Sequence, residues 1–350
     1  MIDDTYDLIV VGGGAVGLAA ASAGAAAGRR VLLVEHIDRI GGTTALSGGM
    51  IWIPDNHKIR EAGVHDEAGH RSATANAHAP QGGVRLALSA GAALSPPSHG
   101  VDDALAFWVP VSCWTRDDGT QATFPHTVTD RAKPGLIAVN RQGKRFVNEA
   151  VSYHEFVRAQ LRERNDARWA WHICDNRFFW KYGLGKVRPF ALSTRREVAS
   201  GYLSRARTLA ELAERIEVPP ATLQQTVERF NAGARAGRDD EFGRGANIYQ
   251  RHLGDADHQP NPCVAPIEHG PFYAVAVFPG DPGMAAGLMT DEHARVLRAD
   301  DTPIEGLYAC GNDMHSVMNG AYPGPGITLG PALVFGVIAT QHAPGYKLSI

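Results

Sequence analysis

The feature that most constrains the fold is a strand–turn–helix–strand unit near the start of the chain. Asp7 to Val11 has the composition of a short buried strand, and the turn GGGAVG follows at Gly12 to Gly17. An alanine-rich helix to about Ala27 and a second strand, Val31 to Val34, complete the unit, which Glu35 closes. This order predicts a Rossmann-like dinucleotide-binding βαβ unit and therefore an α/β fold.

Each motif residue has a distinct expected role. Gly12 makes the tight turn, Gly14 lets the backbone approach a pyrophosphate, and Gly17 lets the helix pack on the strand. Glu35 can accept hydrogen bonds from a ribose. A GxGxxG turn alone is weak evidence, but here both strands, the helix and the acid accompany it. A glycine turn without a ligand is therefore the less favoured interpretation.

A second glycine-rich loop follows the βαβ unit after only a few residues. Its hydroxyl and backbone N–H groups suit a further phosphate or a ribityl chain, and the alternative is a purely structural loop. The candidate cofactor-binding residues in it are Gly41, Gly42, Thr43, Thr44, Ser47, Gly48 and Gly49.

Composition excludes several classes of protein. The 34 basic and 37 acidic residues nearly balance, which argues against a nucleic-acid or membrane-surface binder. The four cysteines are far apart, and neither they nor the histidines show metal-ligand spacing, so we expect reduced thiols, a cytoplasmic protein and no metal. The apolar run from Leu8 to Gly28 follows acidic residues and is broken by glycines, unlike a signal peptide or a membrane span.

Two amphipathic helices are predicted at Leu209 to Ile216 and Ala221 to Arg235, separated by Val218-Pro219-Pro220. Their spacing resembles that of a DNA-binding helix-turn-helix. Acidic and basic side chains are equally frequent over this stretch, whereas a phosphate-binding face needs a basic excess. We therefore interpret the pair as a structural helical hairpin.

A further glycine-rich segment runs from Gly306 to Pro331, GLYACGNDMHSVMNGAYPGPGITLGP, with glycines at 320, 324, 326 and 330. A strand-like start leads into a polar turn, a glycine-rich turn around Tyr322, and an apolar helix starting near Ile327. The N-terminus of that helix offers free N–H groups to a ligand. We expect Tyr322 to have little core to pack against, which favours a functional role for its hydroxyl group.

Three blocks together carry a family resemblance: VVGGGAVGLAAA at the start, VNRQGKRFVNEAVSYHEF in the middle, and the stretch from Gly306 to Pro331. The chain resembles the FAD-dependent 3-ketosteroid dehydrogenase family, within the fumarate reductase/succinate dehydrogenase flavoprotein superfamily. The resemblance implies a Rossmann-like FAD-binding domain built from both chain ends, residues 1–112 and 286–350. It also implies an inserted α+β catalytic domain at residues 113–285.

The resemblance further implies an activity that introduces a C=C bond next to a ketone in a steroid-like or other bulky apolar substrate. Tyr322 and the Gly326 N–H match the pair that binds the ketone oxygen, and Tyr153 matches the base. A phenol has an unperturbed pKa near ~10, so a tyrosine base needs nearby positive charge or a hydrogen-bond relay, for which His154 and Arg158 are candidates. The FAD contacts implied in the last block are Gly311, Asn312, Asp313, Gly326, Ile327 and Leu329.

The chain departs from the family between residues 64 and 84, where family members carry a much longer segment of the FAD-binding domain. A third active-site tyrosine of the family has no counterpart here. Two alternatives therefore stay open beside the dehydrogenase. One is a fumarate-reductase-like double-bond reductase acting on a small carboxylate, and the other is a flavin-binding or non-catalytic remnant.

Overall fold

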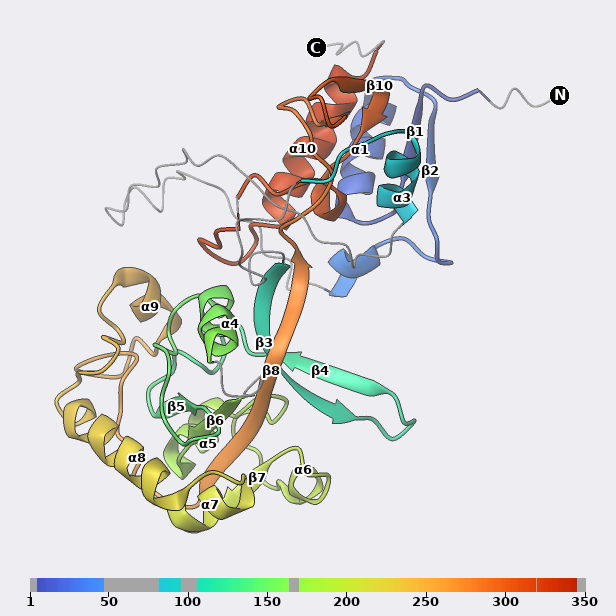
Figure 1. Ribbon diagram of the computed structural model, residues 1–350. Helices are drawn as coiled ribbons and strands as arrows, with labels where there is room; N and C mark the ends of the chain where they lie inside the picture. Colours follow the sequence, from blue (N-terminus) through green and yellow to red (C-terminus); the bar gives the residue numbers. More distant parts are fainter. Residues whose placement is uncertain (1–4, 47–81, 96–105, 164–169, 319, 345–350) are drawn as a thin grey trace. The chain divides into compact units, whose positions relative to one another are not determined.

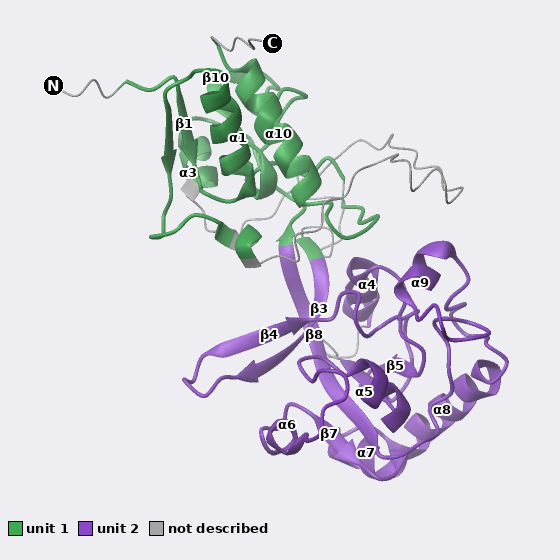
Figure 2. Ribbon diagram, turned by 180° about the vertical axis from the view of Figure 1, so that it is seen from behind, with its two compact units in different colours: residues 1–107, 283–350 green, residues 108–282 purple. Residues whose placement is uncertain are grey.

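The computed structural model describes residues 5–46, 82–95, 106–163, 170–318 and 320–344. The chain divides into two compact units (Figure 2). Unit 1 contains residues 1–107 and 283–350, and unit 2 contains residues 108–282. Unit 1 is thus built from both ends of the chain. The assignment of an FAD-binding and a catalytic domain, with boundaries at residues 112 and 286, stays a prediction.

Unit 1 begins with the predicted βαβ unit. Strands β1 (Leu8–Val11) and β2 (Val31–Val34) pair in parallel, and helix α1 (Ala15–Ala26) connects them (Figure 1). The α/β prediction is therefore confirmed. The outer positions Ile9 and Val11 are 59% and 56% exposed, although parallel sheets are usually covered on both faces.

The last helix of unit 1, α10 (Leu329–His342), packs against α1 (Figure 1). Small residues allow this close approach: a Cβ on Gly336 would lie 3.0 Å from the Val16 carbonyl oxygen. The Thr340 hydroxyl also donates a hydrogen bond to the Ala20 carbonyl oxygen, 3.2 Å away. The other elements of unit 1 are the 3-10 turn η1 (Gly42–Leu46), α3 (Gly82–Ser89), the antiparallel pair β9 (Arg295–Leu297) and β10 (Pro303–Tyr308), and the 3-10 turn η3 (Gly311–Asp313).

Unit 2 is organised around one sheet, whose described strands run in the order β4-β3-β8-β6-β5, with β7 also paired to β8. Its strands are β3 (Ala106–Thr115), β4 (Gln121–Pro125), β5 (Leu136–Val139), β6 (Ala170–Cys174), β7 (Ser204–Ala206) and β8 (Phe272–Met284). Its helices are α4 (Tyr153–Arg162), α5 (Asn176–Tyr182), α6 (Arg195–Ala199), α7 (Leu209–Arg215), α8 (Pro220–Ala234) and α9 (Ile248–Leu253).

Strand β5 shows how the sheet of unit 2 is covered on both faces. All four of its side chains are buried, and successive side chains point to opposite faces of the sheet. Ile137 packs with residues of α7 and α8, the predicted helical hairpin. Leu136 and Ala138 pack with residues of α5 and α4, respectively. Within the described residues, no helix is long and apolar enough to cross a bilayer.

Candidate functional site

The first glycine turn has the geometry that a dinucleotide site needs. Gly12 has φ +103°, a conformation that favours glycine. Gly17 packs so tightly that a Cβ there would lie 1.8 Å from the Gly12 carbonyl oxygen. Gly14 is the N-cap residue of α1 and provides no side-chain cap. The helix therefore begins with backbone N–H groups that the N-cap residue does not satisfy. The turn therefore fits the pyrophosphate of a dinucleotide.

The second glycine loop lies directly against the first. The Gly41 N–H donates to the Gly13 carbonyl oxygen at 2.8 Å, and a Cβ on Gly42 would lie 3.6 Å from the Gly14 Cα. The Thr44 hydroxyl accepts a hydrogen bond from the Ala15 N–H at 3.2 Å, so it faces the N-terminus of α1. The predicted contacts Ser47, Gly48 and Gly49, and the side chain of Thr43, lie outside what the structure describes.

Glu35 follows β2 and is tied to the same turn. One carboxylate oxygen accepts the Gly13 N–H at 2.6 Å, and the other accepts the His36 N–H at 2.6 Å. These backbone donors, Gly13 first, hold the pKa of Glu35 below its ordinary value. The carboxylate is therefore ionised and fixed in place at the end of the strand, and its predicted contact with a ribose stays a prediction.

The third candidate segment, η3, lies against α1. Gly311 has φ +69°, and a Cβ there would lie 2.7 Å from a methyl carbon of Val16. Asn312 is exposed, while burial raises the pKa of the half-buried Asp313 carboxyl group. A cavity of about 20 Å³ lies beside Gly311, Asn312, Ile327 and Thr328. That volume holds about one water molecule, so these residues alone do not enclose a flavin ring.

The glycine-rich turn before α10 presents backbone donors. The helix begins at Leu329, with Thr328 as an N-cap that makes no side-chain capping bond, and Ile327 is buried in the preceding turn. Gly326 has φ +94°, and within the described part of the chain its N–H group donates no hydrogen bond. The Gly326 N–H and the positive end of α10 are donors of the kind that bind an oxygen atom, and their contact with a ligand stays a prediction.

Tyr322 is packed more closely than we expected. Its side chain is only 7% exposed, and its ring contacts the edge of Phe107 with the ring centroids 5.4 Å apart. The expectation that this tyrosine lacks core to pack against was wrong, because Phe107 arrives from a distant part of the sequence. Such packing fixes the ring, which aims the hydroxyl group in one direction.

Tyr153 occupies the first position of α4, in unit 2. The preceding Ser152 caps the helix, since its hydroxyl accepts the Glu155 N–H at 3.2 Å. Tyr153 is 6% exposed. Of the two candidate helpers, the His154 Nδ1 accepts the Trp108 N–H at 3.1 Å, and Arg158 pairs with Glu155 at 3.1 Å. Their predicted role beside Tyr153 stays a prediction.

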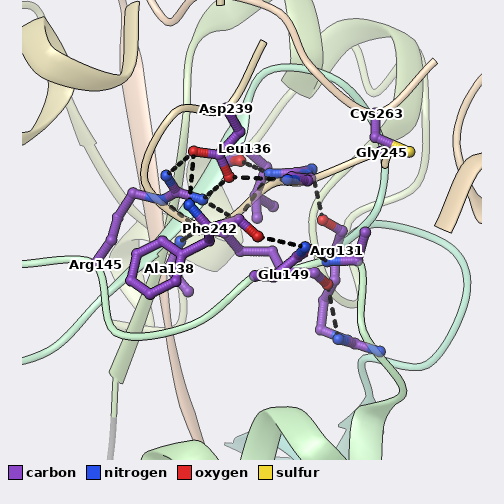
Figure 3. Close-up of polar contacts among 12 residues, drawn as sticks. Arg131, Leu136, Ala138, Arg145, Glu149, Asp239, Phe242, Gly245 and Cys263 are labelled. Carbon is purple, nitrogen blue, oxygen red and sulfur yellow. Dashed lines mark hydrogen bonds and ion pairs between the residues drawn. The ribbon is translucent and has the colours of Figure 1, made fainter. Parts of the chain in front are cut away.

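A buried ion network holds the loop that leads into Tyr153 (Figure 3). Arg145 binds Glu149 and Asp239, with nearest N···O distances of 2.7 Å to each carboxylate, and all three side chains are at most 1% exposed. Arg244 adds a contact to Glu149 at 3.2 Å. Because Glu149 lies in the loop before α4, the network fixes the start of that helix.

Arg131 braces the same loop from another direction. Its guanidinium donates to the carbonyl oxygens of Glu149 and Val151, at 2.9 and 3.2 Å, and lies over the ring of Phe156 at 5.2 Å. Sequence reasoning did not find Arg131 or the ion network. Nothing in the local sequence marks these residues, because Arg145 lies in a largely polar stretch and Asp239 lies 94 residues from it.

The structure brings the predicted residues together in two groups. Gly12, Gly14, Gly17, Glu35 and the segment from Gly311 to Leu329 belong to unit 1, whereas Tyr153 belongs to unit 2. Within unit 1 the glycine turns and the N-termini of α1 and α10 present many backbone N–H donors and few side chains. These residues fit a dinucleotide with an attached planar ring system.

The chain is similar to a known protein family and to several known dehydrogenases. A family model described as "FAD binding domain" matches residues 7–82 and 60–329. A 4-oxocyclohex-2-ene-1-carboxylate 5-dehydrogenase of Sinomonas cyclohexanicum is 44% identical over 67% of this chain and 41% of its own length. A 3-oxosteroid 1-dehydrogenase of Mycolicibacterium smegmatis is 42% identical over 61% of this chain and 38% of its own length.

Among solved structures, the chain is similar to a 3-ketosteroid delta1-dehydrogenase from Sterolibacterium denitrificans in complex with 1,4-androstadiene-3,17-dione. The TM-score is 0.79 at 25% identity, and the match covers 98% of this chain and 100% of that chain. The chain spans about two fifths of the length of the curated relatives that it matches.

Proposed function

Because this chain belongs to the FAD binding domain family, we propose that it is an FAD-dependent dehydrogenase that introduces a C=C bond next to a ring ketone. The observation that carries the proposal is the turn before α10. There, Tyr322 and Gly326 lie four residues apart, beside the positive end of a helix, and the Gly326 N–H donates no hydrogen bond to any residue that the structure describes.

The two donors have a defined task in this reaction. A C–H bond next to a carbonyl group is a weak acid, so its proton leaves only if charge developing on the carbonyl oxygen is stabilised. The Tyr322 hydroxyl and the Gly326 N–H both donate to that oxygen. Phe107 keeps the Tyr322 ring in place, so the donor is oriented before the substrate arrives.

Tyr153 is proposed to accept the proton as a phenolate. Two sources of positive potential support the ionised form: the N-terminus of α4, where Tyr153 is the first residue, and the guanidinium of Arg131, which binds the Val151 carbonyl just before it. When bound, FAD supplies the acceptor for the hydride that leaves the neighbouring carbon. Loss of one proton and one hydride leaves the new double bond.

The relatives suggest the class of substrate. Their names describe dehydrogenases of a 3-oxosteroid and of an oxocyclohexene carboxylate, and both substrates contain a six-membered ring ketone. We therefore propose a cyclic ketone with a CH–CH bond beside the carbonyl group. A steroid and an oxocyclohexane carboxylate are the two forms to compare.

The test has two steps. Purified protein should show the visible spectrum of bound flavin, and a cyclic ketone should drive the reduction of an artificial electron acceptor. Tyr322→Phe should abolish most of that activity, while Tyr182→Phe, a change on α5, should not. Colourless protein would favour the non-catalytic remnant. A yellow protein whose activity survives Tyr322→Phe would refute the assignment of the ketone-binding turn.

A further inference from the structure

Three side chains of metal-binding type meet in the interior of unit 2, and none of them is proposed to contact flavin or ketone. His126 directly follows β4, Asp130 lies four residues later, and His172 belongs to β6. One ligand atom from each lies within 4.8 Å of the others. All three residues are at most 2% exposed, so solvent does not satisfy their polar atoms.

His172 lacks a polar partner. Neither of its ring nitrogens makes a hydrogen bond within the part of the chain that the structure describes, although the residue is fully buried. Its ring packs edge-on against the rings of His126 and Phe156, with centroids 4.8 and 5.5 Å away. Leaving a buried polar atom unsatisfied destabilises the folded state, and such atoms are rare in folded proteins.

His126 is held in an orientation that suits a ligand. Its Nδ1 lies 2.5 Å from an Asp130 carboxylate oxygen, and its Nε2 lies 2.8 Å from the Ser112 hydroxyl. Ser112 in turn lies 2.7 Å from the Tyr202 hydroxyl. A metal-binding histidine commonly has its other ring nitrogen fixed by such a hydrogen bond. Ser112 can therefore hold the ring while Nδ1 binds an ion.

Hydrogen bonds alone also account for His126, but they do not account for His172. In the metal-free arrangement Nδ1–H donates to Asp130, the Ser112 hydroxyl donates to Nε2, and the Tyr202 hydroxyl donates to Ser112. That series of hydrogen bonds does not include His172. An ion shared by the three side chains gives His172 a partner and keeps Asp130 paired with a positive charge.

We propose that His126, Asp130 and His172 bind one divalent transition-metal ion, of which Zn²⁺ is the representative. Two imidazoles and one carboxylate suit Zn²⁺ and its neighbours rather than Ca²⁺ or Mg²⁺, which prefer oxygen ligands. At Zn–ligand distances near ~2.1 Å, tetrahedral ligand atoms lie about 3.4 Å apart. Small side-chain rotations therefore close the site, since its ligand atoms already lie within 4.8 Å.

The surrounding charges set limits on the affinity. The neighbouring residue Arg131 carries a positive charge and repels a cation, and Asp130 is the only carboxylate of the site. We therefore expect weaker binding than at a site made of cysteine thiolates.

The ion would join two parts of unit 2 that are distant in sequence. His126 packs on His172 of β6, and Arg131, five residues after His126, braces the loop before α4. Metal binding should therefore stabilise the folded unit, because an ion that binds only the folded state adds its binding free energy to stability.

The test uses the purified full chain, stripped with a chelator and dialysed against ZnCl₂, with bound zinc measured by elemental analysis. Wild type should retain one Zn²⁺ per chain, and its thermal midpoint should rise with added Zn²⁺. His172→Phe, which keeps the ring shape without nitrogens, should lose the ion and the rise. The same change at His252, exposed on α9, should leave both unchanged.

Asp130→Asn supplies a second variant of nearly the same shape if His172→Phe does not fold. It should weaken Zn²⁺ binding by more than the roughly 10–100-fold that follows loss of an outer hydrogen-bond partner. The proposal is overturned if wild type binds less than one Zn²⁺ per chain. It is equally overturned if folded His172→Phe or Asp130→Asn binds the ion as wild type does.

Discussion

Gly17 lies so close to Gly12 that a single added methyl group would come within 1.8 Å of the Gly12 carbonyl oxygen. Helix α1 can therefore approach β1 only because position 17 has no side chain. The contact sets the direction of the helix N-terminus relative to the turn, and that N-terminus is where we expect the pyrophosphate of FAD.

Gly17→Ala should abolish flavin binding. The clash with backbone atoms forces α1 away from the turn, so the N–H groups no longer converge on one phosphate position. Bound flavin is measured from the visible spectrum after gel filtration. Gly119→Ala is the control, because its φ is +81° but no atom lies within 4 Å of the added methyl group. Retention of flavin by a folded Gly17→Ala protein would contradict the placement.

Arg145→Met should lower the free energy of unfolding by about 3–5 kcal/mol, since it leaves the buried carboxylates of Glu149 and Asp239 short of their partner. Chemical denaturation measures the change. The control is Arg196→Met: Arg196 pairs with Asp117 at an exposed surface, where water screens the ion pair, so the change should have little effect. Equal effects of the two changes would show that burial does not decide the outcome.

Tyr153→Phe should lower kcat by about 10²–10⁴-fold, the usual contribution of a positioned acid or base. Substrate affinity should change little, because Tyr322 and Gly326 are the residues that we propose to bind the ketone oxygen. Steady-state kinetics and a separate binding titration distinguish the two effects. If kcat is unchanged while KM rises, Tyr153 binds the substrate and is not the base.

Acidification should destabilise unit 1 through His315. Burial lowers the pKa of this histidine to about 4, from an ordinary value of 6.5. In the unfolded chain His315 therefore binds a proton below about pH 6.5. In the folded chain it binds one only below about pH 4. Stability falls across that window by about 3 kcal/mol in total and is full above it.

The measurement is the free energy of unfolding at about pH 7 and about pH 5, for wild type and His315→Gln. The variant removes the titrating group, so its loss on acidification should be smaller than that of wild type. Other groups titrate equally in both proteins and cancel in the difference. The same loss in both proteins would exclude His315 as the cause.

Much of the fold was readable because its signals are local. The βαβ unit follows from apolar strands around a glycine turn, and α7 and α8 follow from amphipathic spacing broken at two prolines. The start of α10 was predicted two residues early, at Ile327, because the apolar run begins before the backbone becomes helical. The packing of Tyr322 was not predicted, since nothing near it in sequence indicates Phe107.

The sequence by itself determined the elements whose cause lies within a few residues: the glycines that permit a tight turn, the helix behind them, and the acid at the end of the second strand. Only the tertiary structure decided which charges are buried and paired. Arg145 meets Asp239 across 94 residues, and His172 meets His126 from another strand. The physical reason is that burial and Coulomb energy depend on distance in space, which chain folding sets and which spacing along the sequence does not record.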